Sequence, residues 1–353
     1  MSGPFRVGIS RDFLTSDGRI GFGDIGLGLL DADPGVTYGF LTEHAAELPA
    51  SAVAGYDALL LLAPRITAAT LRGNGRLKLI ARFGVGYDSI DIGACTRAGV
   101  LVTITPDGVR RPVAAAALTF ILALAHRLLD KDRITREGRF ADRISYLGMG
   151  LTGRTLGTVG CGNTARELFT LAAPLGMRHI ASDPYADPQV AAAAGIELVG
   201  LGTLLRAADV VCVMCALTPQ TRRLIDGDRL RLMKPSAYLV NVARGPIVDT
   251  DALVAALRGG VIAGAALDVF DPEPLPAGHP LLHLPNVLLA PHSLCWTDEM
   301  GRGNGRSACE AILDVAHGRL PRYPVNPEAA PDLQAAAGAA PGTSPAGPPG
   351  TMP

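Results

Sequence analysis

One glycine-rich turn limits the fold of this chain more than any other segment. Gly160-Cys-Gly-Asn-Thr-Ala165 follows the apolar run Thr155–Gly160 and opens the helical pattern Ala165–Ala173. In such a turn the first glycine permits a tight bend and the second lets a pyrophosphate approach the backbone, while a small third residue allows close helix–strand packing. The helix start offers free N–H groups to the phosphates. The pattern predicts a Rossmann-type dinucleotide site that includes Gly160 and Gly162.

Asp183 ends the next strand-like run after this turn. A carboxylate at that place accepts hydrogen bonds from both ribose hydroxyls of NAD and repels the 2′-phosphate of NADP. Arg178 and His179 lie close by, but on the strand rather than after it. We therefore expect NAD as the cofactor; the alternative is a structural glycine turn with a helix-capping aspartate.

Two series of short apolar runs without polar alternation surround this turn. Such runs are typical of strands buried on both faces of a parallel sheet. The first series comprises Phe5–Ser10, Ala58–Leu62, Leu79–Phe83 and Val100–Thr103, and the second comprises Thr155–Gly160, Arg178–Ser182, Asp209–Met214, Tyr238–Val242, Ala263–Leu267 and Val287–Leu289. The sequence predicts an α/β protein with two doubly wound parallel-sheet domains and a cleft between them.

The chain length and the ends of the helical patterns predict where the domain boundaries lie. The 353 residues suit about two domains. Pro112 suits the first turn of a long apolar helix to about Leu129, and Arg302 to about His317 is the last helical pattern. We expect a first domain at residues 1–108, completed by 300–326, an NAD domain at 109–299, and a disordered Ala/Pro/Gly-rich tail at 327–353.

Charge and cysteine usage exclude several classes of partner. The 32 basic and 33 acidic residues argue against a nucleic-acid or anionic-membrane surface. The longest apolar stretch, Val113–Ala125, is too short to cross a bilayer, and the start shows no secretion signal, so a cytoplasmic protein is expected. The six cysteines lack metal-site spacing and are interpreted as buried free thiols, with no metal.

Several segments, in family order, resemble the D-2-hydroxyacid dehydrogenase family, whose branches include phosphoglycerate, formate and phosphite dehydrogenases. The segments are Arg82–Asp88, Leu217–Thr221, Asn241–Asp249, Ala266–Pro274 and Ala290–Ser293. The resemblance implies a flavodoxin-like substrate domain beside a Rossmann domain. It also implies hydride transfer between NAD and a small anionic 2-hydroxy acid, and a homodimer formed through the NAD domains.

Three polar residues in these segments suit that chemistry together. Reduction of a 2-keto acid leaves negative charge on the carbonyl oxygen, and His292 is a suitable proton donor. Glu273 would orient the imidazole and favour its protonated form, and Arg244 would bind the substrate and polarise its carbonyl. Taken singly, each has a structural alternative: a surface ion pair for Arg244, a loop histidine and a solvated glutamate.

The resemblance assigns further residues. It implies that the N–H groups of Val85 and Gly86 receive the substrate carboxylate and that Asp268 accepts a hydrogen bond from the nicotinamide amide. Five further residues occupy cofactor-contact positions of the family, although strand packing is the alternative for Cys215 and Val242: Asn163, Thr164, Cys215, Val242 and Ala243.

The chain departs from the family before its long apolar helix. It reads Arg110-Arg-Pro-Val-Ala-Ala115, with Ala115 where relatives usually carry an acid. We expect Arg110 or Arg111 to bind a second anionic group of the substrate; a solvated arginine pair at a hinge is the alternative. Two other functions stay open: the same chemistry on a phosphonate or phosphorus oxyanion, and a non-catalytic NAD-sensing protein.

Overall fold

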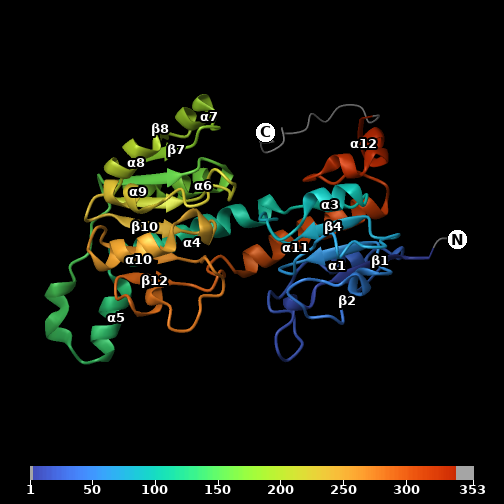
Figure 1. Cartoon of the computed structure of the whole chain (residues 1–353), viewed down its shortest axis with the longest axis horizontal. Coiled ribbons are helices and arrows are strands. Elements are labelled where there is room, and N and C mark those ends of the chain that lie inside the picture. The colour runs from blue at the N-terminus through green and yellow to red at the C-terminus, as the bar shows by residue number, and fades with distance from the viewer. Residues whose placement is uncertain (1–2, 339–353) are drawn as a thin grey trace. The chain divides into compact units, whose positions relative to one another are not determined.

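The computed structural model describes residues 3–338, and its contacts divide the chain into two α/β units. The first unit comprises Met1–Val109 with Trp296–Pro353, and the second comprises Arg110–Cys295. Each unit has one sheet whose strands are all parallel, as the uninterrupted apolar runs predicted (Figure 1). The prediction of two parallel-sheet α/β domains is therefore confirmed.

The first unit has a five-stranded sheet in the order β2-β1-β3-β4-β5. Its strands are β1 Phe5–Ile9, β2 Val36–Phe40, β3 Ala58–Leu61, β4 Leu79–Arg82 and β5 Leu101–Thr103. Its helices are α1 Gly28–Asp31, α2 Ala50–Val53, α3 Ile92–Arg97, α11 Asp298–Ala316 and α12 Pro331–Gly338, with short 3₁₀ turns η1 Arg11–Phe13 and η6 Pro327–Ala329.

The second unit has a seven-stranded sheet in the order β12-β11-β10-β9-β6-β7-β8. Its strands are β6 Thr155–Val159, β7 Arg178–Ser182, β8 Glu197–Leu198, β9 Val210–Val213, β10 Tyr238–Asn241, β11 Gly264–Leu267 and β12 Val287–Leu289. Its helices are α5 Leu128–Arg136, α6 Asn163–Ala172, α7 Pro188–Ala193, α8 Leu201–Ala207, α9 Gly227–Leu232 and α10 Thr250–Arg258, with 3₁₀ turns η2 Phe140–Tyr146, η3 Ala173–Leu175, η4 Gly245–Ile247 and η5 Pro280–His283.

Both faces of this second sheet are buried, which explains why its strands lack polar alternation. Along β9, Val211 and Val213 belong to the core beneath α8, α9 and α10. Val210 and Cys212 belong to the opposite core, which α6 and the long helix α4, Pro106–Ala125, cover. Successive side chains of a strand point to opposite faces, so a strand between two cores must be apolar throughout.

The long apolar helix differs from its prediction. Helix α4 runs from Pro106 to Ala125, so Pro112 lies inside it rather than in its first turn. The helix stops before Leu129 because Arg127 adopts a left-handed φ of 52° and α5 begins at Leu128. Its 20 residues are long and apolar enough to cross a membrane, but 56% of its most apolar stretch is buried inside the protein, as in a core helix.

Other corrections concern edges and the tail. Strands β2 and β8 lie at sheet edges, and neither shows the continuous apolar run used to find the others. Part of the predicted disordered tail is folded, since η6 and α12 occupy residues 327–338. Asn326 fixes this segment to β5: its side chain accepts the Val102 N–H at 2.7 Å and donates to the Val100 carbonyl at 3.0 Å. The rest of that predicted tail lies outside the described residues.

Candidate active site

The carboxyl edge of the seven-stranded sheet gathers most of the predicted site residues. The turn at Gly160 follows β6, Asp183 follows β7, and Cys215 comes shortly after β9. A second group follows the next strands of the sheet: Val242, Ala243 and Arg244 after β10, Asp268 after β11, and His292 after β12. Ligands of open α/β sheets bind at this edge.

The glycine turn has the shape of a phosphate cradle. Gly160 has φ +99°, and a Cβ there would lie 2.8 Å from the backbone nitrogen of Cys215. Only glycine fits this position. Gly162 is the N-cap residue of the ten-residue helix α6, whose first residues are Asn163 and Thr164. Unpaired N–H groups at that helix start suit a pyrophosphate, so the residues present fit a dinucleotide.

Asp183 joins the glycine turn to the end of β7. One carboxylate oxygen accepts the Cys161 N–H at 2.8 Å and the other accepts the Tyr185 N–H at 2.9 Å. A carboxylate has about four acceptor positions, so each oxygen keeps one for a ribose hydroxyl. The carboxylate is thus held in place while it remains able to bind a sugar.

His292 and Glu273 lie in direct contact. Imidazole Nδ1 is 2.5 Å from Glu273 Oε1, and the two side chains are 43% and 37% exposed. The other Glu273 oxygen accepts the Phe270 N–H at 3.1 Å. Burial acts to raise the pKa of Glu273, but the hydrogen bond and charge of His292 outweigh it and hold that pKa below its usual value. The glutamate is therefore an ionised partner for the histidine near neutral pH.

Arg244 lies on a turn that is held by the buried side-chain amide of Asn241. Asn241, which is only 1% exposed, donates from Nδ2 to the Arg244 carbonyl at 3.0 Å and accepts the Ala243 N–H at 3.0 Å. The Arg244 guanidinium donates to the Ala243 carbonyl at 2.7 Å, and its charge helps to lower the pKa of Glu273. Sequence reasoning did not single out Asn241, although it opens the segment that resembles the family.

Asp268 makes contacts that the sequence did not indicate. Its carboxylate accepts the backbone N–H groups of Ser293 and Leu294, at 3.0 and 3.2 Å. Burial raises the pKa of Asp268. His292 immediately precedes these residues and has a left-handed φ of +55°, a conformation that costs energy for a residue with a side chain. Asp268 therefore holds the loop that presents His292.

Within the first unit, Val85 and Gly86 lie on the loop after β4. Arg82 closes this loop by donating from Nε to the Gly86 carbonyl at 2.9 Å and from Nη1 to the Phe83 carbonyl. Among residues 3–338, neither the Val85 nor the Gly86 N–H donates a hydrogen bond to protein. Two adjacent free N–H groups suit a carboxylate.

Arg110 and Arg111 share one acidic partner. Their guanidinium groups lie 3.6 and 2.8 Å from the carboxylate of Glu167 on α6. Both arginine side chains are about half exposed, at 50% and 56%. A substrate anion would have to compete with Glu167 for either of them.

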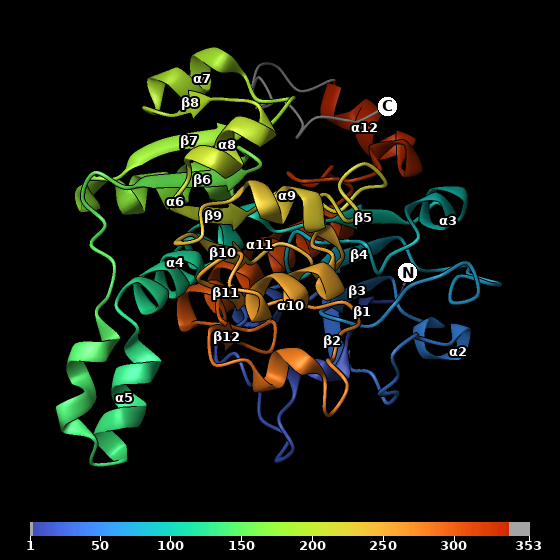
Figure 2. The ribbon, with the colours of Figure 1, turned by 60° about the vertical axis from the view of Figure 1, so that its left-hand side comes forward.

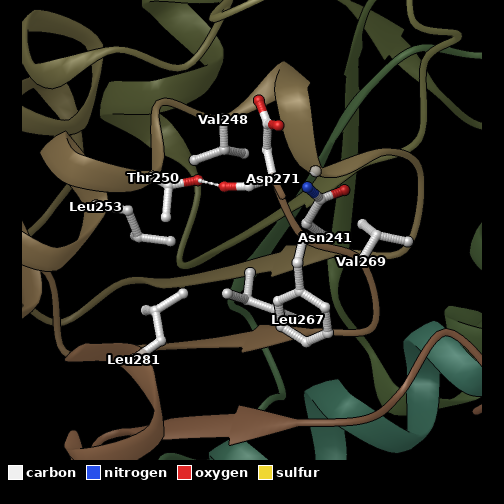
Figure 3. Close-up of a pocket in the computed structure, with 10 residues that line it drawn as sticks. Asn241, Val248, Thr250, Leu253, Leu267, Val269, Asp271 and Leu281 are labelled. Carbon is white, nitrogen blue, oxygen red and sulfur yellow. Dashed lines mark hydrogen bonds between the residues drawn. The ribbon is translucent and has the colours of Figure 1, made fainter. Parts of the chain in front are cut away.

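A small pocket is lined by Asn241 at the end of β10 and by residues of η4, α10 and the segment after β11 (Figure 3). Apolar side chains line most of it, and Thr250 Oγ1 bonds the Asp271 carbonyl at its rim. Its free space is about 10 Å³, which is room for one water at most. The pocket cannot hold a substrate, and we interpret it as a packing gap under the turn that carries Arg244.

Comparison with known proteins identifies related sequences and folds. Residues 118–293 match the family described as "D-isomer specific 2-hydroxyacid dehydrogenase, NAD binding domain". Glyoxylate reductase of Thermococcus onnurineus is 39% identical over 293 residues, which are 81% of this chain and 87% of that enzyme. D-3-phosphoglycerate dehydrogenase of Methanocaldococcus jannaschii is 37% identical over 263 residues, 74% of this chain and 50% of that enzyme.

A solved structure has the same fold over nearly the whole chain. A protein of Thermus thermophilus is 34% identical and has a TM-score of 0.78, with 91% of this chain and 99% of that chain covered. The similarity thus extends through both units.

Proposed function

The chain belongs to the D-isomer-specific 2-hydroxyacid dehydrogenase family and is an NAD-dependent dehydrogenase of 2-hydroxy acids, and we propose that it uses His292, Glu273 and Arg244 to reduce a small 2-keto acid. The contact between His292 and Glu273 is the single observation that most supports this assignment. Bound NADH supplies the hydride, and the residues of the chain bind the substrate and move the proton.

His292 provides the proton that the carbonyl oxygen takes up during reduction. Its Nδ1 faces Glu273, which leaves Nε2 for the substrate. The Glu273 carboxylate stabilises the imidazolium before transfer and orients the ring. In the oxidation direction the neutral imidazole takes the hydroxyl proton, so the same pair serves both directions.

Arg244 and the loop after β4 bind the acid. The Arg244 guanidinium polarises the keto oxygen and pairs with the substrate carboxylate, for which its planar fork is suited. The N–H groups of Val85 and Gly86 are proposed to receive the substrate carboxylate. This division assigns the substrate domain to residues 1–108 with 300–326 and the NAD domain to 109–299.

The glycine turn and the strand ends bind the cofactor. Gly160, Gly162, Asn163 and Thr164 form the pyrophosphate site, and Asp183 accepts the ribose hydroxyls. Cys215, Val242 and Ala243 form the wall of the nicotinamide end through their shape. Asp268 serves that end as well as the His292 loop.

A small carboxylate substrate is favoured over a phosphonate or phosphorus oxyanion. The two arginines expected to bind a second anion are already paired with Glu167. Retention of Arg244, Glu273 and His292 argues for an active enzyme rather than an NAD sensor.

The projecting segment at α5 supports a homodimer. Figure 2 shows α5 and the following chain extending away from the seven-stranded sheet. Five large apolar side chains on it are exposed to between 56% and 86%: Leu128, Leu129, Phe140, Ile144 and Leu147. Apolar groups gathered on one projecting segment mark a protein–protein contact. We assign a second copy of this chain as the partner.

A turnover assay tests the proposed function. Purified protein is mixed with NADH and, in turn, glyoxylate, pyruvate and phenylpyruvate, and the absorbance of NADH is followed together with the formation of the hydroxy acid. We expect NADH consumption with at least one of these acids. A protein that binds NADH but turns over none of them would contradict the proposal and favour a sensor.

A further inference from the structure

Four aromatic side chains form a continuous cluster in the first unit. The ring centroids of Phe13 and Phe83 are 4.9 Å apart, those of Phe22 and Phe83 are 5.3 Å apart, and those of Phe22 and Trp296 are 4.7 Å apart. Phe13 and Phe83 are buried, whereas Trp296 is 50% exposed. The cluster therefore has a buried base and an open apolar side.

The cluster adjoins the loop proposed to hold the substrate carboxylate. Phe83 is two residues before Val85, and the side chains of Val85 and Tyr87 are each 40% exposed. Val85 and Tyr87 thus present apolar surface on the loop that carries the two free N–H groups, and Phe22 and Trp296 extend the apolar surface outward from Phe83. We call Val85, Tyr87, Phe22 and Trp296 the aromatic wall.

Close backbone packing fixes the position of Phe22 in the wall. A Cβ on Gly301 of α11 would lie 2.8 Å from the Phe22 carbonyl oxygen. A Cβ on Gly305, one turn later, would lie 2.2 Å from the Ile25 carbonyl oxygen. The segment that carries Phe22 therefore rests directly on the helix, which lowers the entropic cost of binding a ligand there.

The arginine that closes the substrate loop and the two arginines expected to bind a second anion all have protein partners. Arg82 donates to two carbonyls of its own loop, and Arg110 and Arg111 pair with Glu167. Arg11 and Arg65, which follow β1 and β3, are exposed, and the phosphorylated acid in the substrate comparison below tests whether such cations bind an anionic substituent instead.

We propose that the aromatic wall binds the substituent of the 2-keto acid, so that the substrate is one with an apolar or aromatic side chain. This inference rests on the proposed function, because it places the substrate carboxylate at Val85 and Gly86. Transfer of a phenyl or branched alkyl group from water to such a surface improves binding by roughly 10- to 100-fold.

Substrate competition tests the inference separately from the proposed function. The values of kcat/KM are compared for phenylpyruvate, 4-methyl-2-oxopentanoate, glyoxylate and 3-phosphohydroxypyruvate with NADH. We expect the two apolar acids to exceed glyoxylate by about 10-fold or more. A preference for glyoxylate or the phosphorylated acid would overturn this inference while leaving the proposed function intact. Absence of turnover with every acid would overturn both.

Variants of the wall identify the residues responsible. In Trp296→Ala, the ratio of kcat/KM for phenylpyruvate over glyoxylate should fall about 10-fold, mainly through KM. Phe22→Leu is a milder second variant that keeps the loop packed and should lower the same ratio. Leu282→Ala removes an exposed apolar side chain of the second unit and serves as the control, with an unchanged ratio. If the wall variants lost kcat/KM equally for phenylpyruvate and glyoxylate, the wall would contact protein rather than the substituent of the substrate. That result would contradict the inference.

Discussion

Two buried polar residues determine how the charged residues of the site are presented. Asn241 and Asp268 are 1% and 4% exposed. Their side chains form hydrogen bonds with backbone groups of the turns that carry Arg244 and His292, respectively. Neither needs to touch the reacting atoms for this effect. A buried polar group left unpaired costs about 1–3 kcal/mol, so these contacts hold the turns strongly.

At the same scale, Glu273→Gln tests the histidine partner. The amide keeps the size of the side chain but removes the charge that favours an imidazolium. We expect kcat for reduction to fall by about 10-fold or more. The acid limb that protonation of Glu273 gives to the wild-type pH profile should also be lost, because the amide does not titrate.

The pH profile separates this role from a structural one. The pKa of Glu273 is lowered, so the wild-type carboxylate stays ionised into the pH range where an ordinary glutamate takes up a proton. Its charge is lost only under more acidic conditions. A Gln variant with reduced kcat but an unshifted profile would show that Glu273 only fills space.

Strands that form continuous apolar runs could be predicted from the sequence, including the edge strands β5 and β12, whereas the edge strands β2 and β8 could not. The interior strands β3, β4, β6, β9 and β10 are continuous apolar runs, because both of their faces meet protein. Strand β2, Val36–Phe40, has one partner strand and carries Thr37 and Gly39. The Asp107-Gly108 pair resembles a turn, yet it lies in the first turn of α4. Tertiary packing, rather than the local sequence, determines the secondary structure of such segments.

His179 on β7 is expected to make the fold less stable at acidic pH. His179 stacks on Phe169 with centroids 4.7 Å apart, and its buried Nε2 has no hydrogen-bond partner among the described residues. Burial lowers its pKa below the ordinary value. As the pH falls through the ordinary histidine range, the unfolded chain takes a proton that the folded strand resists, so stability falls.

His179→Phe should reduce this acid sensitivity. The melting temperature is measured at about pH 7.5 and about pH 5.5, on either side of the ordinary histidine pKa, for the wild type and the variant. We expect the wild type to lose more Tm between the two conditions than the variant does, since phenylalanine has no proton to bind. Equal losses would show that His179 is protonated without strain in the folded protein.

On the scale of the whole molecule, the order of the motifs predicted which residues lie at the site, but it did not predict the long-range contacts between side chains. The strand-end positions of Arg244, Asp268 and His292 follow from the order of the motifs, since parallel strands end at one edge. The pairing of Arg110 and Arg111 with Glu167 joins residues far apart in the sequence. No local pattern carries that information, and it changes the expected use of both arginines.

Assembly is the second property at this scale. The double variant Phe140→Glu with Ile144→Glu places two charges on the exposed segment after α5. Charges buried against apolar surface are costly, so we expect the proposed dimer to dissociate at micromolar concentration, as measured by light scattering after size exclusion. Leu282→Glu is the matched control and should keep the wild-type mass. A dimer that survives the double substitution would place the interface elsewhere.

The most direct test of the account is the turnover of His292→Ala, measured together with NADH binding in the same variant. We expect kcat to fall by at least about 100-fold, while the dissociation constant for NADH, from fluorescence titration, stays close to that of the wild type. Wild-type turnover in this variant would contradict the central claim that His292 moves the proton.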